Sequence, residues 1–138
     1  IMIYITRQEH FNAAHRLFQN GLSDEENLEI FGKCSNPNWH GHNYSLFVTI
    51  KGEVNPKTGF LINLKTLSKI INEKIIDKAD HRNLNLEVDF MEGILPSAEN
   101  IAIQIWKVLD EPIKAHGAEL HCIRLYETER NYVEYYGS

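Results

Sequence analysis

Cysteine is nearly absent from this 138-residue sequence, which contains only Cys34 and Cys122. Two cysteines in a chain of this length do not make the disulfide framework that stabilises small secreted domains. We therefore expect the chain to work in a reducing compartment, and in the cytoplasm in particular.

Long hydrophobic runs are also absent, and no stretch is long and apolar enough to span a bilayer. The N-terminus carries no secretory signal, so we expect no membrane partner. Basic residues are outnumbered, since 14 Lys and Arg stand against 19 Asp and Glu, for a net charge of −5. This balance argues against a general nucleic-acid binder but allows an anionic small molecule held by a few local positive groups.

Internal repeats, low-complexity runs and linkers are missing too. With 43% hydrophobic and 24% charged residues, the composition is that of an ordinary globular protein. A chain of this length can bury one sizeable core. We therefore expect a single domain over residues 1–138.

Alternation of apolar and polar residues predicts four strands. They cover about residues 2–15, 40–52, 119–128 and 132–136. In the first strand Arg7 and Glu9 interrupt the apolar side, which indicates either a bulge or an exposed section. We expect irregular structure over residues 16–31 and over most of residues 79–96.

Apolar residues three and four positions apart predict two helices. Asn63 is a candidate N-cap for the first and Ser97 for the second, which Pro112 should end or kink. The order strand, strand, helix, helix, strand, strand predicts an α+β fold, with the helices covering one face of a four-stranded antiparallel sheet. The other face must be wet or buried by another subunit, and aromatic residues favour burial. These are Phe47, Tyr132, Tyr135 and Tyr136.

The stretch Gly32–Tyr44 carries the strongest chemical signal. His40 and His42 are two positions apart on a strand, so both imidazoles point the same way and can reach one ion. His15, at the apolar end of the first strand, would add a third neutral nitrogen. Three histidines with an open fourth position are typical of catalytic zinc, whereas four ligands that include thiolates are typical of structural zinc. Cys34 as a fourth ligand would make the site structural, and this alternative stays open.

Cys34 has two further interpretations, as an inert thiol or as an acid–base group. A nearby positive charge or metal ion stabilises a thiolate near neutral pH, and Lys33 and a divalent ion would both do so. Cys122 alternates with apolar residues, which is typical of a small buried hydrophobe. The remaining histidines are expected on the surface or in the core; those considered are His10, His116 and His121.

Carboxylates at two places are weaker candidates. Asp80 would orient the neighbouring His81 for proton transfer, but only a loop brings both side chains to one site. Glu127, at the end of a strand, has the parity of inward-facing apolar residues. A carboxylate there needs hydrogen-bond donors, such as the N–H groups of a nitrogen heterocycle, or a salt-bridge partner.

Short motifs occur in one order along the chain. They are Phe11–His15, Gly32–Cys34 with Asn36–Asn38, His40–Tyr44, Asp80–Leu84, Glu99–Asn100 and Tyr126–Thr128. In this order they resemble the 6-pyruvoyltetrahydropterin synthase family, which includes the 6-carboxytetrahydropterin synthases of queuosine biosynthesis. The resemblance covers nearly the whole chain, down to Val133–Gly137.

The resemblance implies a T-fold, in which three subunits close a barrel and two barrels stack into a homohexamer with active sites at subunit interfaces. It also implies a zinc-dependent lyase that acts on 7,8-dihydroneopterin triphosphate. The zinc ligands of the family correspond to His15, His40 and His42.

The resemblance assigns roles to the remaining candidates. The cysteine that corresponds to Cys34 accepts a proton, and the pair that corresponds to Asp80 and His81 assists from a neighbouring subunit. The glutamate that corresponds to Glu127 anchors the pterin ring and also takes part in the catalytic proton relay. The same pocket is lined by the positions of Ser97, Ala98 and Glu99.

The spacing between Cys34 and His40 bears on the product. Five residues separate them, as in the members that form 6-pyruvoyltetrahydropterin. Carboxy-forming members, which act on the same substrate and release acetaldehyde, often have a shorter gap. We therefore expect a 6-pyruvoyltetrahydropterin synthase of tetrahydrobiopterin biosynthesis. A 6-carboxytetrahydropterin synthase is the alternative, and a non-catalytic zinc-stabilised assembly module is a remote one.

Two departures from the family pattern lie beside these residues. Trp39 stands where glycine is usual before His40, and Ala98 replaces a hydroxyl residue before Glu99. Charge and proximity in the sequence give three candidates for binding the triphosphate: Arg16, Lys33 and Arg82.

Overall fold

Two long antiparallel strands form the frame of the fold. The computed structural model describes residues 1–138, and in it β1 (Met2–His15) pairs with β2 (His40–Glu53) along its whole length. The register is unbroken, so the bulge considered for β1 is excluded. Arg7 is exposed on this strand, whereas the half-buried Glu9 carboxylate accepts hydrogen bonds from Arg7, Ser68 and Asn72.

The sheet has five strands in the order β3-β1-β2-β4-β5 and is mixed rather than purely antiparallel. β4 (Glu119–Tyr126) and β5 (Tyr132–Tyr135) extend the antiparallel part. The unexpected strand is β3 (Arg82–Asn83), which pairs parallel to β1 within a segment expected to be loop. The expected four strands are present, but the expected strand count was wrong because it left out the short edge strand β3. Two residues are too few to show an alternating pattern in the sequence.

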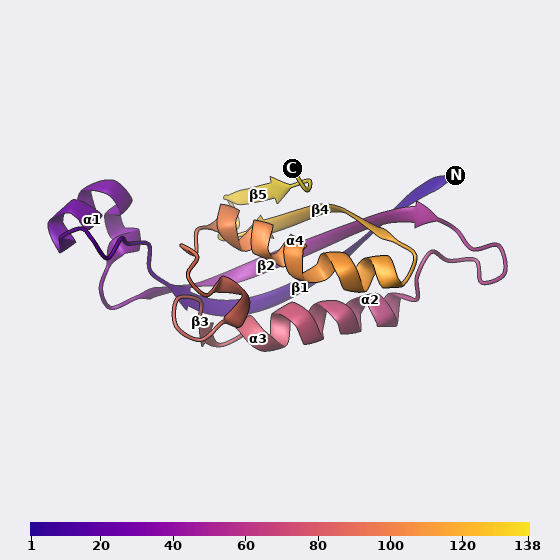
Figure 1. Cartoon of the computed structure of the whole chain (residues 1–138), viewed down its shortest axis with the longest axis horizontal. Coiled ribbons are helices and arrows are strands. Elements are labelled where there is room, and N and C mark those ends of the chain that lie inside the picture. The colour runs from indigo at the N-terminus through magenta and orange to yellow at the C-terminus, as the bar shows by residue number, and fades with distance from the viewer.

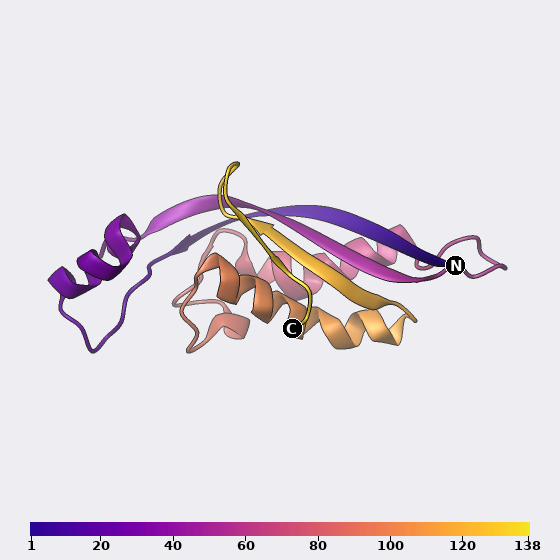
Figure 2. The same cartoon turned by 90° about the horizontal axis from the view of Figure 1, so that it is seen from above.

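Two helical segments cover one face of the sheet, as Figure 2 shows. The first begins after the N-cap Asn63 as α2 (Leu64–Ile71) and continues through a π-helical turn (Asn72–Ile76) into α3 (Asp77–Ala79). The second, α4 (Ala98–Ala115), begins after the N-cap Ser97. None of the helices combines the length and apolar character needed to cross a bilayer.

Pro112 neither ends α4 nor marks its boundary. The helix continues three residues further, to Ala115. Proline removes one hydrogen-bond donor from a helix interior, but Leu109 and Ile113 on either side are fully buried. Burial of this apolar stripe stabilises the last turn against that loss.

The core lies between the helices and the facing side of the strands. β2 contributes alternate residues, from Tyr44 to Ile50, that are fully buried. α2 and α4 contribute stripes at helical spacing, including Leu67, Ile71 and Ile105. Because the same parity of β1 and β2 continues to the histidines, these strands carry the histidines onto the helix-covered face.

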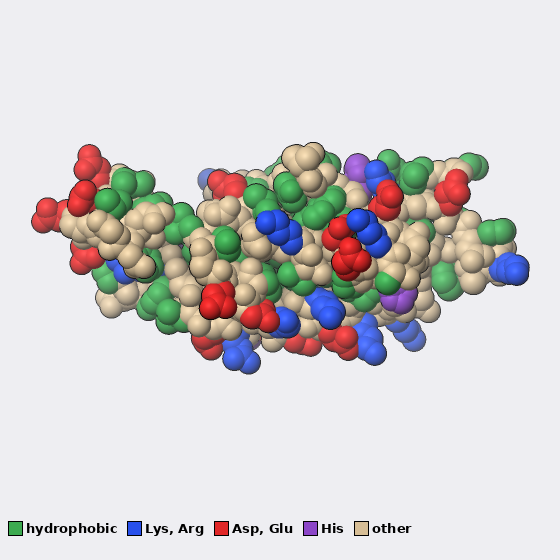
Figure 3. Space-filling model, in the orientation of Figure 1, with side chains coloured by type: hydrophobic (Ala, Val, Ile, Leu, Met, Phe, Trp, Pro, Cys, Tyr) green, Lys and Arg blue, Asp and Glu red, His purple; other side chains and the backbone are tan.

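A short helix that the sequence analysis did not expect lies at one end of the molecule. α1 (Asp24–Phe31) occupies part of the segment taken as irregular, and a 3-10 turn (Gly32–Ser35) follows it. Figure 1 shows α1 beyond the ends of β1 and β2, apart from the other helices. Figure 3 shows acidic side chains gathered at this end, and the first turn of α1 is wholly acidic.

Candidate metal centre and active site

Three imidazoles meet where β1 ends and β2 begins. The antiparallel register pairs His15 with His40 and places His42 opposite Ala13, one step inside. The ring centroid of His15 lies 4.5 Å from that of His40 and 5.1 Å from that of His42. Ligand atoms of all three residues lie within 4.8 Å of one another. The strand pairing therefore brings together the three histidines that the spacing singled out.

The nitrogens of this cluster fit a metal ion because most have no other partner. Nδ1 of His15 donates a hydrogen bond to the carbonyl oxygen of Pro96 at 2.8 Å, which leaves Nε2 with a free lone pair. His15 Nε2, both ring nitrogens of His40 and Nε2 of His42 are buried without a hydrogen-bond partner. Unpartnered buried polar atoms are costly and rare. A metal ion would satisfy them together.

The surroundings of His15 and His40 favour the neutral form of both imidazoles. Burial, followed by the neighbouring histidines, lowers the pKa of His15 to about 4 despite the opposing bond to Pro96. Burial and then His42 lower the pKa of His40. Metal binding requires the unprotonated ring, so the site is prepared for a cation at neutral pH.

Cys34 lies beside the histidines on the 3-10 turn. A cleft of about 730 Å³ is lined by this thiol together with His40 and His42. The sulfur of Cys34 is not among the ligand atoms that group around one point. Burial, and then the charge of Glu127, raise the pKa of the thiol in the metal-free chain. The thiol is therefore placed to meet a molecule held in the cleft.

Glu127 connects this cleft to a second one. Its Oε1 lies 3.6 Å from Nε2 of His42, and it lines a neighbouring cleft of about 420 Å³ with Ala98, Glu99 and Arg130. Ser97 does not line either cleft. Its hydroxyl accepts a hydrogen bond from the N–H of Asn100 as the N-cap of α4. The two clefts thus offer adjacent spaces, one beside histidines and a thiol and one beside carboxylates.

Asp80 and His81 lie together, but outside the cleft of Cys34. Asp80 follows α3, and His81 adopts a φ of 61°, so the two side chains meet with His81 Nδ1 3.0 Å from Asp80 Oδ2. The N–H of Asn12 donates to Asp80 and is the main cause of its lowered pKa, with His81 contributing. Neither residue lines the cleft at Cys34 or the cleft at Glu127. Within one chain the pair therefore stands outside the candidate site.

Sequence reasoning missed the part of the cleft that α1 forms. Asp24 and Leu28 both line the cleft of Cys34. The signal was present, because Ser23 and Glu26 form a capping box with hydrogen bonds in both directions. A Ser followed three positions later by Glu marks a helix start.

Trp39 occupies a backbone position that favours glycine. Its φ is 68°, in the left-handed region that side chains other than glycine adopt at a cost. Its N–H donates to the carbonyl oxygen of Asn36 and closes the turn that leads directly into His40. The conformation is thus set by the turn that aims the first metal-ligand candidate of β2.

Comparison with known proteins agrees with this arrangement. A model of the 6-pyruvoyl tetrahydropterin synthase family matches residues 4–138. The chain is 46% identical over 135 residues to the 6-pyruvoyl tetrahydrobiopterin synthase of Poecilia reticulata, covering 97% of this chain and 90% of that protein. It is 43% identical over 133 residues to that of Homo sapiens, covering 96% and 90%.

A solved structure shares the whole architecture. The 6-pyruvoyl tetrahydropterin synthase of Caenorhabditis elegans superimposes with a TM-score of 0.91 at 38% identity, covering 100% of this chain and 97% of that chain. A family match over nearly all residues and close relatives of similar length lead to one conclusion. The chain belongs to the 6-pyruvoyl tetrahydropterin synthase family.

Proposed function

We propose that the chain is a zinc-dependent lyase that eliminates triphosphate from 7,8-dihydroneopterin triphosphate and forms 6-pyruvoyltetrahydropterin. The observation that carries this proposal is the cluster of unpartnered imidazole nitrogens beside a free thiol in one cleft. The relatives that match over most of the chain bear this activity in their names.

His15, His40 and His42 would hold the zinc ion. Three neutral imidazoles leave a coordination position open, and bound zinc polarises oxygen atoms of a ligand as a Lewis acid. The bond from His15 Nδ1 to Pro96 fixes the ring so that Nε2 faces the site. We propose that Cys34 stays outside the coordination shell, because its sulfur lies outside the group of ligand atoms.

Glu127 would anchor the pterin ring. A carboxylate accepts two N–H bonds, which suits the amino group and ring N–H of a pterin. Ala98 and Glu99 would line the same pocket, while the Ser97 hydroxyl serves the helix cap. With the ring in the cleft of Glu127, the substrate side chain extends past His42 toward Cys34. Such orientation brings the reacting carbon within reach of the thiol.

Cys34 would act as the proton acceptor. The base would be the Cys34 thiolate, which a bound zinc ion and Lys33 would stabilise against the effects of burial and Glu127. The thiolate takes a proton from a side-chain carbon of the substrate, and the C–O bond to the triphosphate breaks as that group leaves. Asp80 would hold His81 in position to move the remaining protons, and this pair would come from a neighbouring subunit.

A T-fold homohexamer of single-domain chains would complete the site. The open edges of the sheet at β3 and β5, and its uncovered face, are available for barrel closure. Because Asp80 and His81 lie outside both clefts of their own chain, the proposed mechanism needs a second copy.

The product tests the proposal directly. The zinc-loaded protein is incubated with 7,8-dihydroneopterin triphosphate, and the pterin product is identified by mass. We expect 6-pyruvoyltetrahydropterin and free triphosphate. A 6-carboxy product with release of acetaldehyde would assign the alternative activity. An inactive protein that unfolds when zinc is chelated would instead indicate a structural metal and an assembly module.

A further inference from the structure

We propose that Arg16 is the positioning residue that fixes Cys34 relative to the histidine cluster, an inference that rests on the proton-acceptor role of Cys34. Arg16 directly follows His15 in the chain. Arg16 is therefore covalently joined to one metal-ligand candidate. Its side-chain contacts can hold the turn that carries the thiol at a fixed distance from that histidine.

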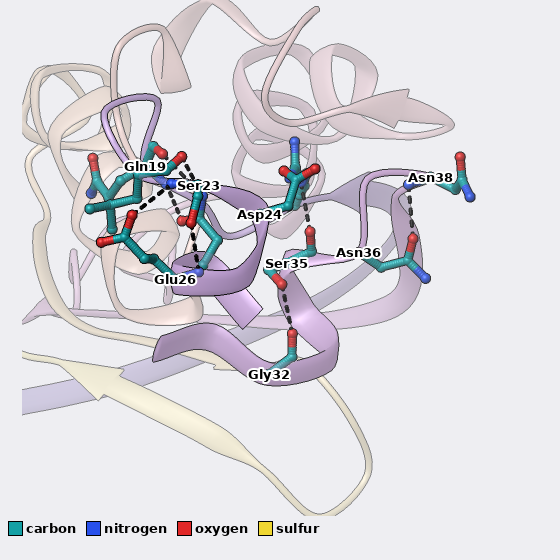
Figure 4. A network of polar contacts seen from close by, with 11 residues as sticks. Gln19, Ser23, Asp24, Glu26, Gly32, Ser35, Asn36 and Asn38 are labelled. Atoms are coloured by element: carbon teal, nitrogen blue, oxygen red, sulfur yellow. Dashed lines mark hydrogen bonds and ion pairs between the residues drawn. The ribbon is translucent and has the colours of Figure 1, made fainter. Parts of the chain in front are cut away.

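The guanidinium of Arg16 is held between three groups. Its Nε donates a hydrogen bond to the carbonyl oxygen of Ser35 at 2.8 Å, and its Nη2 lies 3.5 Å from Oδ1 of Asp24. The guanidinium carbon lies 4.0 Å from the ring centroid of Phe18. Figure 4 shows Ser35 of the turn and Asp24 of α1 in this polar network. The side chain thus joins the end of β1 to both elements that border the cleft.

The backbone of Arg16 is fixed as firmly as its side chain. Its N–H donates to Oδ1 of Asn85, and Nδ2 of Asn85 donates back to its carbonyl oxygen, both at 2.9 Å. The next residue, Leu17, donates its N–H to the carbonyl oxygen of Cys34 at 2.8 Å. Two consecutive carbonyl groups, those of Cys34 and Ser35, are therefore tied to two consecutive residues at the end of β1.

These contacts argue against the expectation that Arg16 binds the triphosphate. Only 14% of its side chain is exposed, and its Nε and Nη2 face oxygen atoms of the protein. Its planar fork and its stacking on Phe18 suit a fixed structural contact, which a lysine would not reproduce. Arg16 is therefore a positioning residue and not a phosphate ligand.

The decisive variant is Arg16→Gln, assayed as the zinc-loaded protein. Misplacement of a reacting group by about 1 Å can lower the rate about 100-fold. We expect kcat to fall between about 10-fold and 100-fold, with KM within about threefold of wild type and zinc content unchanged. A rise in KM at unchanged kcat would make Arg16 a substrate-binding residue and overturn the proposal, as would unchanged kinetics.

Arg7→Gln is the matched control. Arg7 also donates from Nε to an oxygen at 2.8 Å, in its case to Glu9, but it lies near the middle of β1 and away from the histidines at its end. The Arg7→Gln substitution removes the same charge as Arg16→Gln, and we expect wild-type kinetics. Should Arg16→Gln fail to fold, Arg16→Lys keeps the charge and one donor nitrogen, and we expect an intermediate kcat. Wild-type kcat in a folded Arg16→Lys protein would also contradict the proposal.

Alkylation of Cys34 separates this inference from the proposed function. If wild type forms no product, the proposed function fails while the position of the thiol can still be measured. We expect iodoacetamide to modify Cys34 severalfold faster in Arg16→Gln than in wild type, both loaded with zinc, because the turn is released from β1. Equal alkylation rates would show that Arg16 does not hold the turn.

Discussion

His15 combines three properties in one fully buried side chain. Its position at the end of β1 brings it to His40, its Nδ1 is committed to the carbonyl of Pro96, and its Nε2 has no protein partner. Each property follows from a neighbour in the fold rather than from the residue type. Burial of His15 favours its neutral form, so the free energy of unfolding depends on pH.

The first prediction concerns the metal-free protein at acidic pH. The pKa of a histidine in the unfolded chain is 6.5, whereas that of folded His15 is about 4. Between these values the unfolded chain binds more protons, so acid favours unfolding. We expect His15 to lower the free energy of unfolding by roughly 2 kcal/mol between pH 7 and pH 5. Urea titrations at several pH values give the free energy of unfolding as a function of pH. Between pH 7 and pH 5 this free energy should fall more steeply in wild type than in His15→Gln, and an equal fall in both proteins would contradict the prediction.

The second prediction concerns the thiol. Cys34→Ala should lower turnover by at least about 100-fold, the usual contribution of a positioned acid–base group, while zinc content stays at the wild-type level. Cys122→Ala is the control, since Cys122 is a buried residue of β4 and lines neither cleft of the site. Full turnover in Cys34→Ala with zinc bound would rule out the proton-acceptor role.

At the scale of elements, the long regular segments could be predicted and the short irregular ones could not. Fourteen-residue strands with a constant parity fix which face each histidine occupies, so β1 and β2 were predictable along with the histidine cluster. β3 has two residues and no period, and its pairing depends on where the chain returns to β1. α1 was missed because its apolar residues show only a weak helical periodicity, and the capping signal at Ser23 was not recognised.

The third prediction tests whether α1 depends on that cap. Ser23→Ala removes the acceptor for the N–H of Glu26 and should destabilise α1 by about 1 kcal/mol. We expect faster amide hydrogen exchange in α1 and little change in the exchange of β2, since α1 lies apart from the helices that cover the sheet. Unchanged exchange in α1 would mean that tertiary contacts, and not the capping box, hold this helix.

At the scale of the whole molecule, the position of Asp80 and His81 could not be predicted from the spacing or periodicity of the sequence. Sequence adjacency indicated a pair, and the loop conformation at His81 does bring the two side chains together. Their absence from both clefts is a property of the tertiary fold. In the proposed mechanism, the pair would therefore reach the site from an associated chain.

Mixed assemblies test this sharing of sites. Cys34→Ala and His81→Ala should each be inactive alone, and their co-expression should restore activity. In randomly mixed oligomers about a quarter of the sites receive the wild-type residue from both chains, so we expect about a quarter of wild-type turnover. Activity no higher than the mean of the two single variants would place all catalytic residues in one chain.

X-ray absorption at the zinc edge of the loaded protein tests the central claim, that three imidazoles hold the ion while the thiol of Cys34 stays outside its shell. We predict nitrogen and oxygen ligands at about 2.0–2.1 Å and no sulfur. A sulfur ligand at about 2.3 Å would show that Cys34 closes the site, and would contradict the account.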